Sequence, residues 1–225
     1  MKNDISIRPG KRFVASYSGG KDSVFAIYRA ISGGMLPHRL ITTYNTDMAR
    51  SWFHGIPGDV LSAVSKSLGI EIELIRTSGK EYGASFEAAL VRACSEGAEV
   101  CVFGDIDIEA HLEWCSERCA IAGVAPCLPL WGGERKALVL EFLAAGFMTV
   151  ITTVDTTRMP ESYLGKTLSP EIVDELEAAG IDACGENGEF HTFTFDGPIF
   201  KEPVLPMFGA PIRRDKYSTL PMERA

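Results

Sequence analysis

Phe13-Val14-Ala15-Ser16-Tyr17, followed directly by Ser18-Gly19-Gly20-Lys21-Asp22-Ser23, is the stretch that decides the fold class. The first five residues form a short apolar run typical of a buried strand, and residues 22–30 have the pattern of a helix. Adjacent glycines let backbone N–H groups turn toward a ligand, and the start of a helix offers further unpaired N–H groups to an anion. The stretch therefore predicts a strand, a phosphate-binding loop and a helix.

The side chains of this loop strengthen the prediction of a phosphate site. Lys21 adds a charged donor, and Ser18 and Ser23 add hydroxyls. Asp22 would repel phosphates unless a cation lay between them, which suggests a Mg²⁺ ion held by Asp22. The loop is not a Walker A motif, because Ala15 stands where that motif needs glycine, and no G-x-G-x-x-G occurs. The alternative is an ordinary Gly-Gly turn capped by Asp22.

The pattern of strand and helix continues outward from this loop. Such alternation predicts βαβ units and a mainly parallel, doubly wound sheet. Further strands are expected at 40–44, 70–75 and 100–103, and helices at 59–68, 85–95 and 109–122.

The pattern changes after about residue 130. A helix over 134–145 and a strand over 147–154 are followed by a helix that Ser169 would cap with Pro170 in its first turn. A strand over 189–195 ends at Asp196-Gly197, a hairpin-type turn signal. We expect a smaller C-terminal α+β subdomain, so that the domains are 1–130 and 131–225.

Length and composition narrow the class of protein. The chain has 225 residues, 46% hydrophobic residues and a net charge of −8, which is ordinary for a globular protein and argues against nucleic acid as the main partner. The N-terminus does not resemble a secretory signal, and the apolar stretch 137–154 is interrupted by Glu141 and Gly146. Six cysteines without a CxxC pair are typical of a reduced, cytoplasmic protein without membrane contact.

A second dense group of polar residues lies at Gly185-Glu186-Asn187-Gly188-Glu189-Phe190-His191-Thr192. Two carboxylates, an amide and an imidazole occur within six residues, in a turn that leads into a strand. Glu189 and His191 are two apart and would share one strand face. The alternative is a polar turn with a structural histidine.

SGGKDS after the first strand resembles the PP-loop of the N-type ATP pyrophosphatases, the superfamily of GMP synthetase, asparagine synthetase and tRNA-thiolating enzymes. The resemblance implies an adenine nucleotide alpha hydrolase-like (HUP-like) fold and cleavage of ATP between the α and β phosphates.

GENGEFHT and the following Phe193-Thr194-Phe195-Asp196-Gly197-Pro198-Ile199-Phe200 resemble the end segment of diphthine–ammonia ligases. His54-Gly55-Ile56-Pro57, Phe103-Gly104-Asp105-Ile106 and Pro129-Leu130-Trp131 match as well, so the resemblance extends from Phe13 to about Pro206. It implies an ATP-dependent, amide-forming ligase that amidates diphthine on translation elongation factor 2 with ammonium. Diphthine would become an acyl-adenylate, and AMP and pyrophosphate would leave.

The resemblance also suggests roles for individual residues. Ser18, Gly19, Gly20, Lys21 and Ser23 would bind the phosphates of ATP. Lys21, Asp22, Glu186, Glu189 and His191 would be catalytic, with Asp22 on Mg²⁺ and the last three at the ammonia end, where Asn187 would bind substrate.

Several further residues are weaker candidates. Asp105 follows a predicted parallel strand and would touch the nucleotide or Mg²⁺, the alternative being a cap of the next helix. His54 would bind substrate or nucleotide. Trp131, Phe190 and Phe193 would hold the trimethylammonium group of diphthine together with Glu186 and Glu189, unless these rings belong to the core.

Three other readings stay open. The chain could adenylate a different carboxylate, or it could be a nucleotide sensor that does not turn over. A homodimer is also kept open. Free ammonium is the expected nitrogen source, because the first cysteine is Cys94 and no glutaminase nucleophile stands at the start of the chain.

Overall fold

A computed structural model describes residues 4–52, 54–78 and 80–224 of the chain. The chain forms two compact units, each built from three separate stretches of the sequence. The first unit contains Met1–Ser18, Asp22–Phe53 and Gly69–Gly132, and the second contains Gly19–Lys21, His54–Leu68 and Gly133–Ala225. Three residues of the predicted phosphate loop thus belong to the second unit, although the loop follows a strand of the first.

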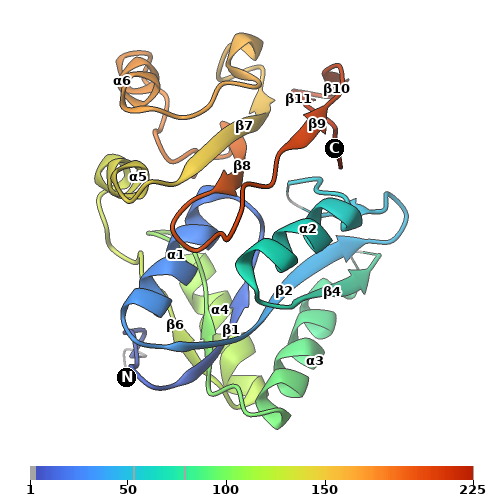
Figure 1. The fold of residues 1–225 in the computed structure, drawn as a ribbon, viewed down its shortest axis with the longest axis vertical. Coiled ribbons are helices and arrows are strands. Elements are labelled where there is room, and N and C mark those ends of the chain that lie inside the picture. The colour runs from blue at the N-terminus through green and yellow to red at the C-terminus, as the bar shows by residue number, and fades with distance from the viewer. Residues whose placement is uncertain (1–3, 53, 79, 225) are drawn as a thin grey trace. The chain divides into compact units, whose positions relative to one another are not determined.

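The first unit is built on a parallel sheet with the strand order β4-β2-β1-β5-β6 (Figure 1). Counted along the chain, the parallel strands take the order 3-2-1-4-5, which is the doubly wound order. The strands are β1 (Arg12–Ser16), β2 (Leu36–Asn45), β4 (Ile72–Thr77), β5 (Val100–Val102) and β6 (Ala125–Cys127), and the short β3 (Arg50–Ser51) pairs antiparallel with the end of β2. The predicted doubly wound parallel sheet is confirmed.

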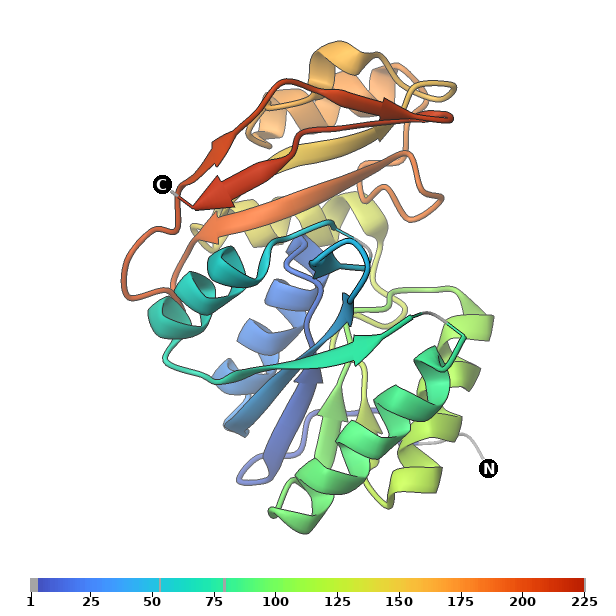
Figure 2. The same cartoon turned by 90° about the vertical axis from the view of Figure 1, so that its right-hand side faces the viewer.

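Helices cover both faces of this sheet. α3 (Tyr82–Ser95) and α4 (Glu109–Ala122) lie together on one face, and α1 (Lys21–Ser32) lies on the other (Figures 1 and 2). Phe13, Val14 and Ala15 of β1 are fully buried, because a central strand has neighbours on both faces. The apolar run that predicted this strand is explained by that double burial.

The second unit has an antiparallel sheet with the order β10-β11-β7-β8. Its strands are β7 (Met148–Asp155), β8 (Phe190–Asp196), β10 (Ile212–Arg214) and β11 (Tyr217–Thr219), and a separate pair is formed by β9 (Pro206–Phe208) and β12 (Met222–Arg224). The same unit contains α2 (Gly58–Leu68), α5 (Arg135–Ala144), α6 (Pro170–Ala178) and a 3₁₀ turn at Glu161–Tyr163. This mixture matches the predicted α+β character of the C-terminal half.

A local signal predicted from the sequence sets the start of α6. Ser169 caps α6 by accepting a hydrogen bond from the Ile172 N–H at 3.4 Å, with Pro170 in the first turn, as predicted. The hairpin predicted at Asp196-Gly197 is wrong: β8 ends there, but the next strand, β9, pairs with β12. The short strands β3, β6 and β9 to β12 were not predicted, since two or three residues carry no periodicity.

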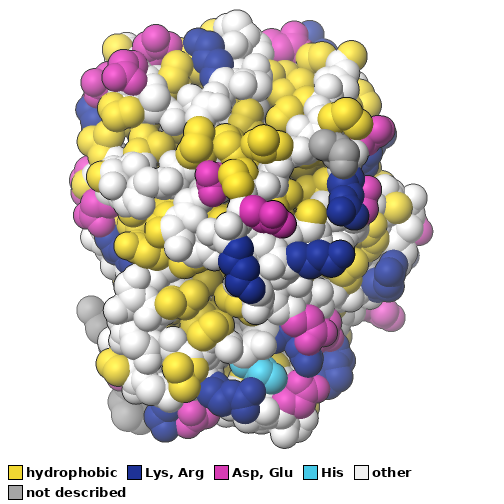
Figure 3. Space-filling view, viewed as in Figure 1, with side chains coloured by type: hydrophobic (Ala, Val, Ile, Leu, Met, Phe, Trp, Pro, Cys, Tyr) yellow, Lys and Arg dark blue, Asp and Glu magenta, His cyan; other side chains and the backbone are white. Residues whose placement is uncertain are grey.

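The surface carries both signs of charge. On the face shown in Figure 3, Lys and Arg side chains are interspersed with Asp and Glu side chains. Over the described residues, no helix has the length and apolar character that a membrane crossing needs. Whether residues 1–130 and 131–225 are separate domains stays a prediction.

Candidate active site

The phosphate-loop sequence lies between β1 and α1, as predicted. Gly19 has a φ of +87°, a left-handed conformation that favours glycine. In the first unit, the Ser23 hydroxyl accepts a hydrogen bond from the Ser18 N–H at 3.3 Å, and the two hydroxyls lie 3.1 Å apart. The two serines therefore close the loop across its base.

Lys21 is almost completely buried, with 3% of its surface exposed. Its ammonium group donates to the Cys184 carbonyl oxygen, and Nζ lies 5.8 Å from the centroid of the Phe190 ring. A buried ammonium requires such partners, because an unpaired charge away from water is very unfavourable. The charge of the loop thus lies inside the second unit, beside the segment that contains the second motif.

Strand β8 forms hydrogen bonds with backbone groups of the loop. The Lys21 N–H donates to the Thr192 hydroxyl at 3.1 Å, and the Thr194 N–H donates to the Gly19 carbonyl at 2.9 Å. Both contacts lie within the second unit. The two motifs, more than 160 residues apart in sequence, are therefore joined directly.

His54 packs against the loop from the same unit. Its Nδ1 lies 2.8 Å from the Thr192 carbonyl oxygen. A carbonyl only accepts, so Nδ1 carries the proton and Nε2 of the neutral ring keeps a lone pair. A Cβ on Gly20 would lie 2.5 Å from His54 Cε1, so only glycine leaves room for this ring.

Two imidazoles lie side by side at this place. The His54 and His191 ring centroids are 4.9 Å apart. Burial, with smaller contributions from His191 and Lys21, lowers the pKa of His54 to about 3, and burial followed by Lys21 lowers the pKa of His191. Both rings are thus neutral near pH 7, next to a buried ammonium group.

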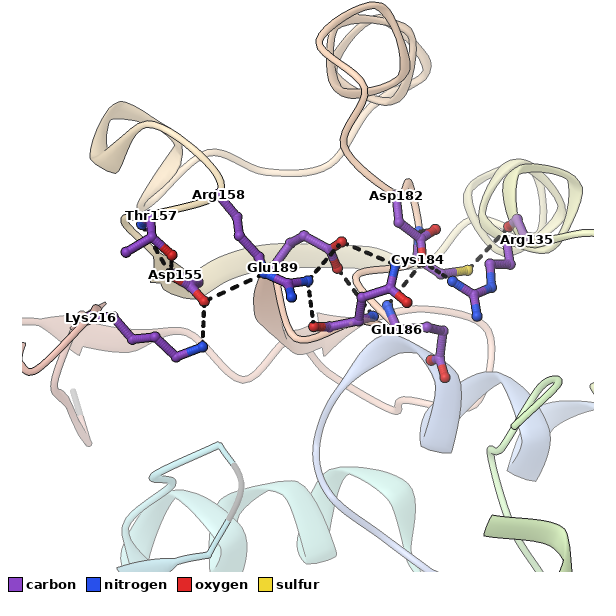
Figure 4. A network of polar contacts seen from close by, with 10 residues as sticks. Arg135, Asp155, Thr157, Arg158, Asp182, Cys184, Glu186, Glu189 and Lys216 are labelled. Atoms are coloured by element: carbon purple, nitrogen blue, oxygen red, sulfur yellow. Dashed lines mark hydrogen bonds and ion pairs between the residues drawn. The ribbon is translucent and has the colours of Figure 1, made fainter. Parts of the chain in front are cut away.

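The turn of the second motif is held by Glu189 (Figure 4). Its carboxylate accepts from the Asn187 N–H and from the Asn187 side-chain amide, each at 3.1 Å, and Arg158 Nη1 lies 3.5 Å away. Glu189 has 7% of its surface exposed. Its oxygens are therefore engaged within the protein, which favours a positioning role for this carboxylate.

Asp182 fixes the other end of the turn. It forms an ion pair with Arg135 and accepts from the Cys184 N–H at 2.9 Å and from the Glu186 N–H at 3.2 Å (Figure 4). These bonds orient the peptide whose carbonyl receives the Lys21 ammonium. The Glu186 carboxylate extends from this turn and is half-buried.

A buried acid supports the turn from β7. Asp155 is fully buried and accepts from Lys216 Nζ at 2.7 Å and from the Thr157 N–H at 3.0 Å. Hydrogen bonds from Lys216 and then Thr157 lower the pKa of Asp155 to about 2. The Asp155 N–H donates to the Glu189 carbonyl at 2.8 Å, so this ionised anchor extends to the second motif.

Asp105 is a further candidate residue of the first unit. Asp105, after β5, lies 2.9 Å from His111 Nδ1 and accepts from the Cys115 thiol at 3.7 Å. The alternative prediction of a helix cap is wrong, because Ile108 is the N-cap of α4 and no side chain caps it. Contact between Asp105 and a nucleotide stays a prediction.

Asp22 has the chemistry that Mg²⁺ requires. It lies half-buried in the first turn of α1. A carboxylate oxygen is a ligand that Mg²⁺ takes, commonly with one or two carboxylates and the phosphates of a substrate. Among the described residues, no group of three or more His, Cys, Asp or Glu side chains is placed to hold a metal ion.

The aromatic candidates differ in position. Phe193 is fully buried and Phe190 is 3% exposed, so both rings belong to the core of the second unit. Trp131 belongs to the first unit and packs, partly buried, against its core. The burial of the two phenylalanine rings favours the core alternative for them, and contact of Phe190, Phe193 and Trp131 with the substrate stays a prediction.

A hollow opens at the carboxyl ends of β1 and β2 in the first unit. It encloses about 290 Å³, including the space open to solvent, and Ser18 of the loop lines it. Ligands of open α/β sheets bind at this end of the strands.

Some residues of the site were not singled out from sequence. Thr192 and Gly104 stand inside quoted motifs, but no role was given to them. Gly104 is needed because a Cβ there would lie 2.7 Å from the Asp22 carbonyl carbon and the Ser23 nitrogen. Cys184 binds the Lys21 ammonium with its backbone carbonyl, a contact that no side-chain pattern can indicate.

The fold and the site define an α/β protein with a PP-loop, the class that binds ATP. Two family models match the chain: the diphthamide synthase N-terminal domain over residues 11–126, and the diphthamide synthase C-terminal domain over residues 134–205. The chain belongs to the diphthamide synthase family. This confirms the predicted family and the class of ATP-dependent amide-forming ligases.

Similar proteins carry the corresponding name. Diphthine–ammonia ligase of Rattus norvegicus is 27% identical over an alignment that covers 86% of this chain and 82% of the relative. The protein of the same name from Danio rerio is 25% identical, with 86% of each chain covered. The crystal structure of a predicted subunit of tRNA methyltransferase from Methanocaldococcus jannaschii matches 86% of this chain and 100% of its own at 18% identity, with a TM-score of 0.44.

Proposed function

We propose that this protein amidates diphthine on translation elongation factor 2, using ATP and ammonium. A diphthine carboxylate oxygen attacks the α-phosphorus of ATP, the bond between the α-phosphorus and the bridging oxygen to the β-phosphate breaks, and pyrophosphate leaves. Ammonia then attacks the acyl carbon of the adenylate, one proton is lost and AMP leaves. The reaction would take place in the cytoplasm, where the elongation factor works.

One observation carries the proposal: the phosphate loop and the second motif are bonded together. Thr192 binds the Lys21 N–H, and the Cys184 carbonyl binds the Lys21 ammonium. An adenylating ligase needs its phosphate-binding charge and the groups that bind the acyl substrate in one place, because adenylation and amide formation occur at the same carboxyl group.

The roles of the loop follow from its donors. Backbone N–H groups of Gly19 and Gly20, with Lys21, Ser18 and Ser23, would stabilise the charge that grows on the departing pyrophosphate. Asp22 would hold a Mg²⁺ ion, which would neutralise phosphate charge when bound. The Lys21 ammonium donates to the Cys184 carbonyl in this structure and would have to donate to a phosphate oxygen when ATP is bound. We therefore propose that Lys21 changes its hydrogen-bond partner when ATP binds.

The second motif would form the substrate and ammonia end. Glu186 is the carboxylate that projects from the turn, so we assign it to the cationic ammonium or trimethylammonium group. Asn187 is exposed and would contact the substrate, while Glu189 positions it. His191 would contact the reacting groups as a neutral imidazole, since burial and then the nearby Lys21 charge lower its pKa. Asp105, His54, Trp131 and Phe190 keep their predicted roles.

The first alternative, adenylation of another carboxylate, uses the same loop and differs only in the molecule whose carboxylate is adenylated.

The test of the proposed function is a product assay. Purified protein is incubated with ATP, ammonium chloride and elongation factor that carries diphthine. We expect AMP, pyrophosphate and the mass change of a carboxylate converted to an amide. Products that appear without the elongation factor support another carboxylate, and ATP retained without cleavage supports the sensor. A homodimer stays a prediction that the mass in solution tests.

A further inference from the structure

Arg158 is a cation beside the second motif that the reaction proposed above does not use. It follows the end of β7, where its N–H donates to the Asp155 carbonyl at 2.9 Å, so its backbone is held in place. Its Nη1 donates to the Asn187 carbonyl at 2.9 Å, and the side chain thereby reaches the turn of the motif (Figure 4). These contacts lie within the second unit, which also contains Lys21.

Among the described cations that contact this turn and its network, Arg158 is the most exposed. Its side chain is 46% exposed, against 41% for Lys216 and 26% for Arg135. Lys216 and Arg135 each bind a carboxylate of the network, and the buried Lys21 ammonium donates to a backbone carbonyl. Arg158 is therefore the cation of the turn that a molecule from solvent reaches first.

The positive charge of Arg158 is not matched by a closely bonded carboxylate. Nη1 lies 3.5 Å from Glu189, and Nε lies 3.8 Å from Asp155, at or beyond the limit of a hydrogen bond. Among the residues that the structure describes, Nη2 forms no hydrogen bond or ion pair. A guanidinium carries N–H donors on all three nitrogens, so one edge of this group is available to a ligand.

We propose that the Nη2 edge of Arg158 binds the carboxylate of the substrate that is to be amidated. The inference rests on the proposed function and adds the residue that recognises the reacting group. A carboxylate that approaches this turn meets the negative charges of Glu186 and Glu189, which repel it unless a cation is close. Arginine suits this role because its planar guanidinium forms charge-assisted hydrogen bonds with a carboxylate and does not lose its proton.

The turn also carries the opposite charge that the substrate requires. Diphthine has a trimethylammonium group beside its carboxylate, and the Glu186 carboxylate is assigned to that group. Arg158 reaches the turn from the end of β7, whereas Glu186 extends from the turn itself (Figure 4). One anionic and one cationic side chain at the same turn match a zwitterion better than they match a simple carboxylate.

The position also agrees with the phosphate site of the same unit. Lys21 Nζ lies 5.8 Å from the centroid of the Phe190 ring, and Phe190 directly follows Glu189, which Arg158 contacts. A carboxylate bound by Arg158 would thus be near the charge that is assigned to the phosphates of ATP, as adenylation requires.

The test compares elongation factor that carries diphthine with the same factor carrying diphthamide, because the two differ only in a carboxylate and an amide. Calorimetry without ATP gives the affinity of each form. We expect Arg158→Gln to bind the diphthine form roughly 10- to 100-fold more weakly, the range of a hydrogen bond to a charged group. Affinity for the diphthamide form should hardly change, since a neutral amide does not require the cation.

Two further variants and the kinetics separate recognition from support of the turn. The glutamine amide can still donate to the Asn187 carbonyl, so Arg158→Gln should raise KM for the diphthine form and change kcat less. Arg158→Lys should recover part of the affinity, because it keeps the charge but not the planar donors. Arg213→Gln is the matched control: Arg213 is an exposed arginine of the same unit that donates to the Thr156 hydroxyl at 2.8 Å, and its loss should change neither affinity.

Equal losses of affinity for the diphthine and diphthamide forms would overturn the inference, because Arg158 would then only support the turn. An unchanged KM in Arg158→Gln would overturn it as well. If the unaltered protein does not amidate the diphthine form, the proposed function fails and this inference fails with it. If it does so and Arg158→Gln matches it, only the assignment of Arg158 fails.

Discussion

The buried neutral state of His54 predicts a specific dependence of stability on pH. The pKa of His54 is about 3 in the folded protein, against 6.5 for an unhindered imidazole. Between these values the unfolded chain binds a proton that the folded chain does not. The contribution of His54 is therefore most favourable above pH 6.5 and is lost as the pH falls toward 3, with a slope of up to about 1.4 kcal/mol per pH unit.

The perturbation that isolates this group is His54→Asn, because the asparagine amide can still donate to the Thr192 carbonyl. Between pH 6.5 and 5 the unaltered protein should lose about 1.6 kcal/mol more unfolding free energy than the variant, because the slope rises from half its maximum at pH 6.5 to nearly its full value at pH 5. The acidic residues titrate in both proteins, so the difference between them reports His54.

Two measurements check this expectation. Urea unfolding at pH 5, 6 and 7 gives the two slopes, and NMR titration of the imidazole protons reports the protonation of His54 directly. A His54 signal that titrates near pH 6.5, or equal slopes for the two proteins, would refute the argument that burial holds this ring neutral.

Three further changes test the site. Lys21→Ala should reduce kcat about 10²–10³-fold and should also lower the unfolding free energy by about 2 kcal/mol, because it removes a buried charged donor. Thermal unfolding measures the loss of stability, and AMP release measures the loss of activity. Lys201→Ala, at an exposed lysine, is the control. Gly20→Ala should lower AMP release by displacing the His54 ring, and recovery in Gly20→Ala/His54→Ala identifies the clash as the cause; equal activity of the single and double variants contradicts it. Asp155→Ala should lower the unfolding free energy by about 2 kcal/mol at pH 7, because Lys216 and Thr157 lose their acceptor; an unchanged urea midpoint would exclude the anchoring role.

The sequence by itself determined the doubly wound sheet and the position of the phosphate loop. Both follow from local chemistry: the apolar run of β1 is continuous because the strand is buried on both faces, and adjacent glycines are required where the loop turns. The family could also be predicted from two short motifs, because each consists of particular side chains at fixed spacing.

Only the tertiary structure decided what these motifs contact. Lys21 and Thr192 are 171 positions apart, and no spacing rule connects residues at that separation. The engagement of the Glu189 carboxylate by Asn187 and the contact of Arg158 with the Asn187 carbonyl were equally invisible, because a residue type states what a side chain can bond and not whether it is already bonded. Partners are set by packing over the whole chain, and packing is the property that a local pattern does not contain.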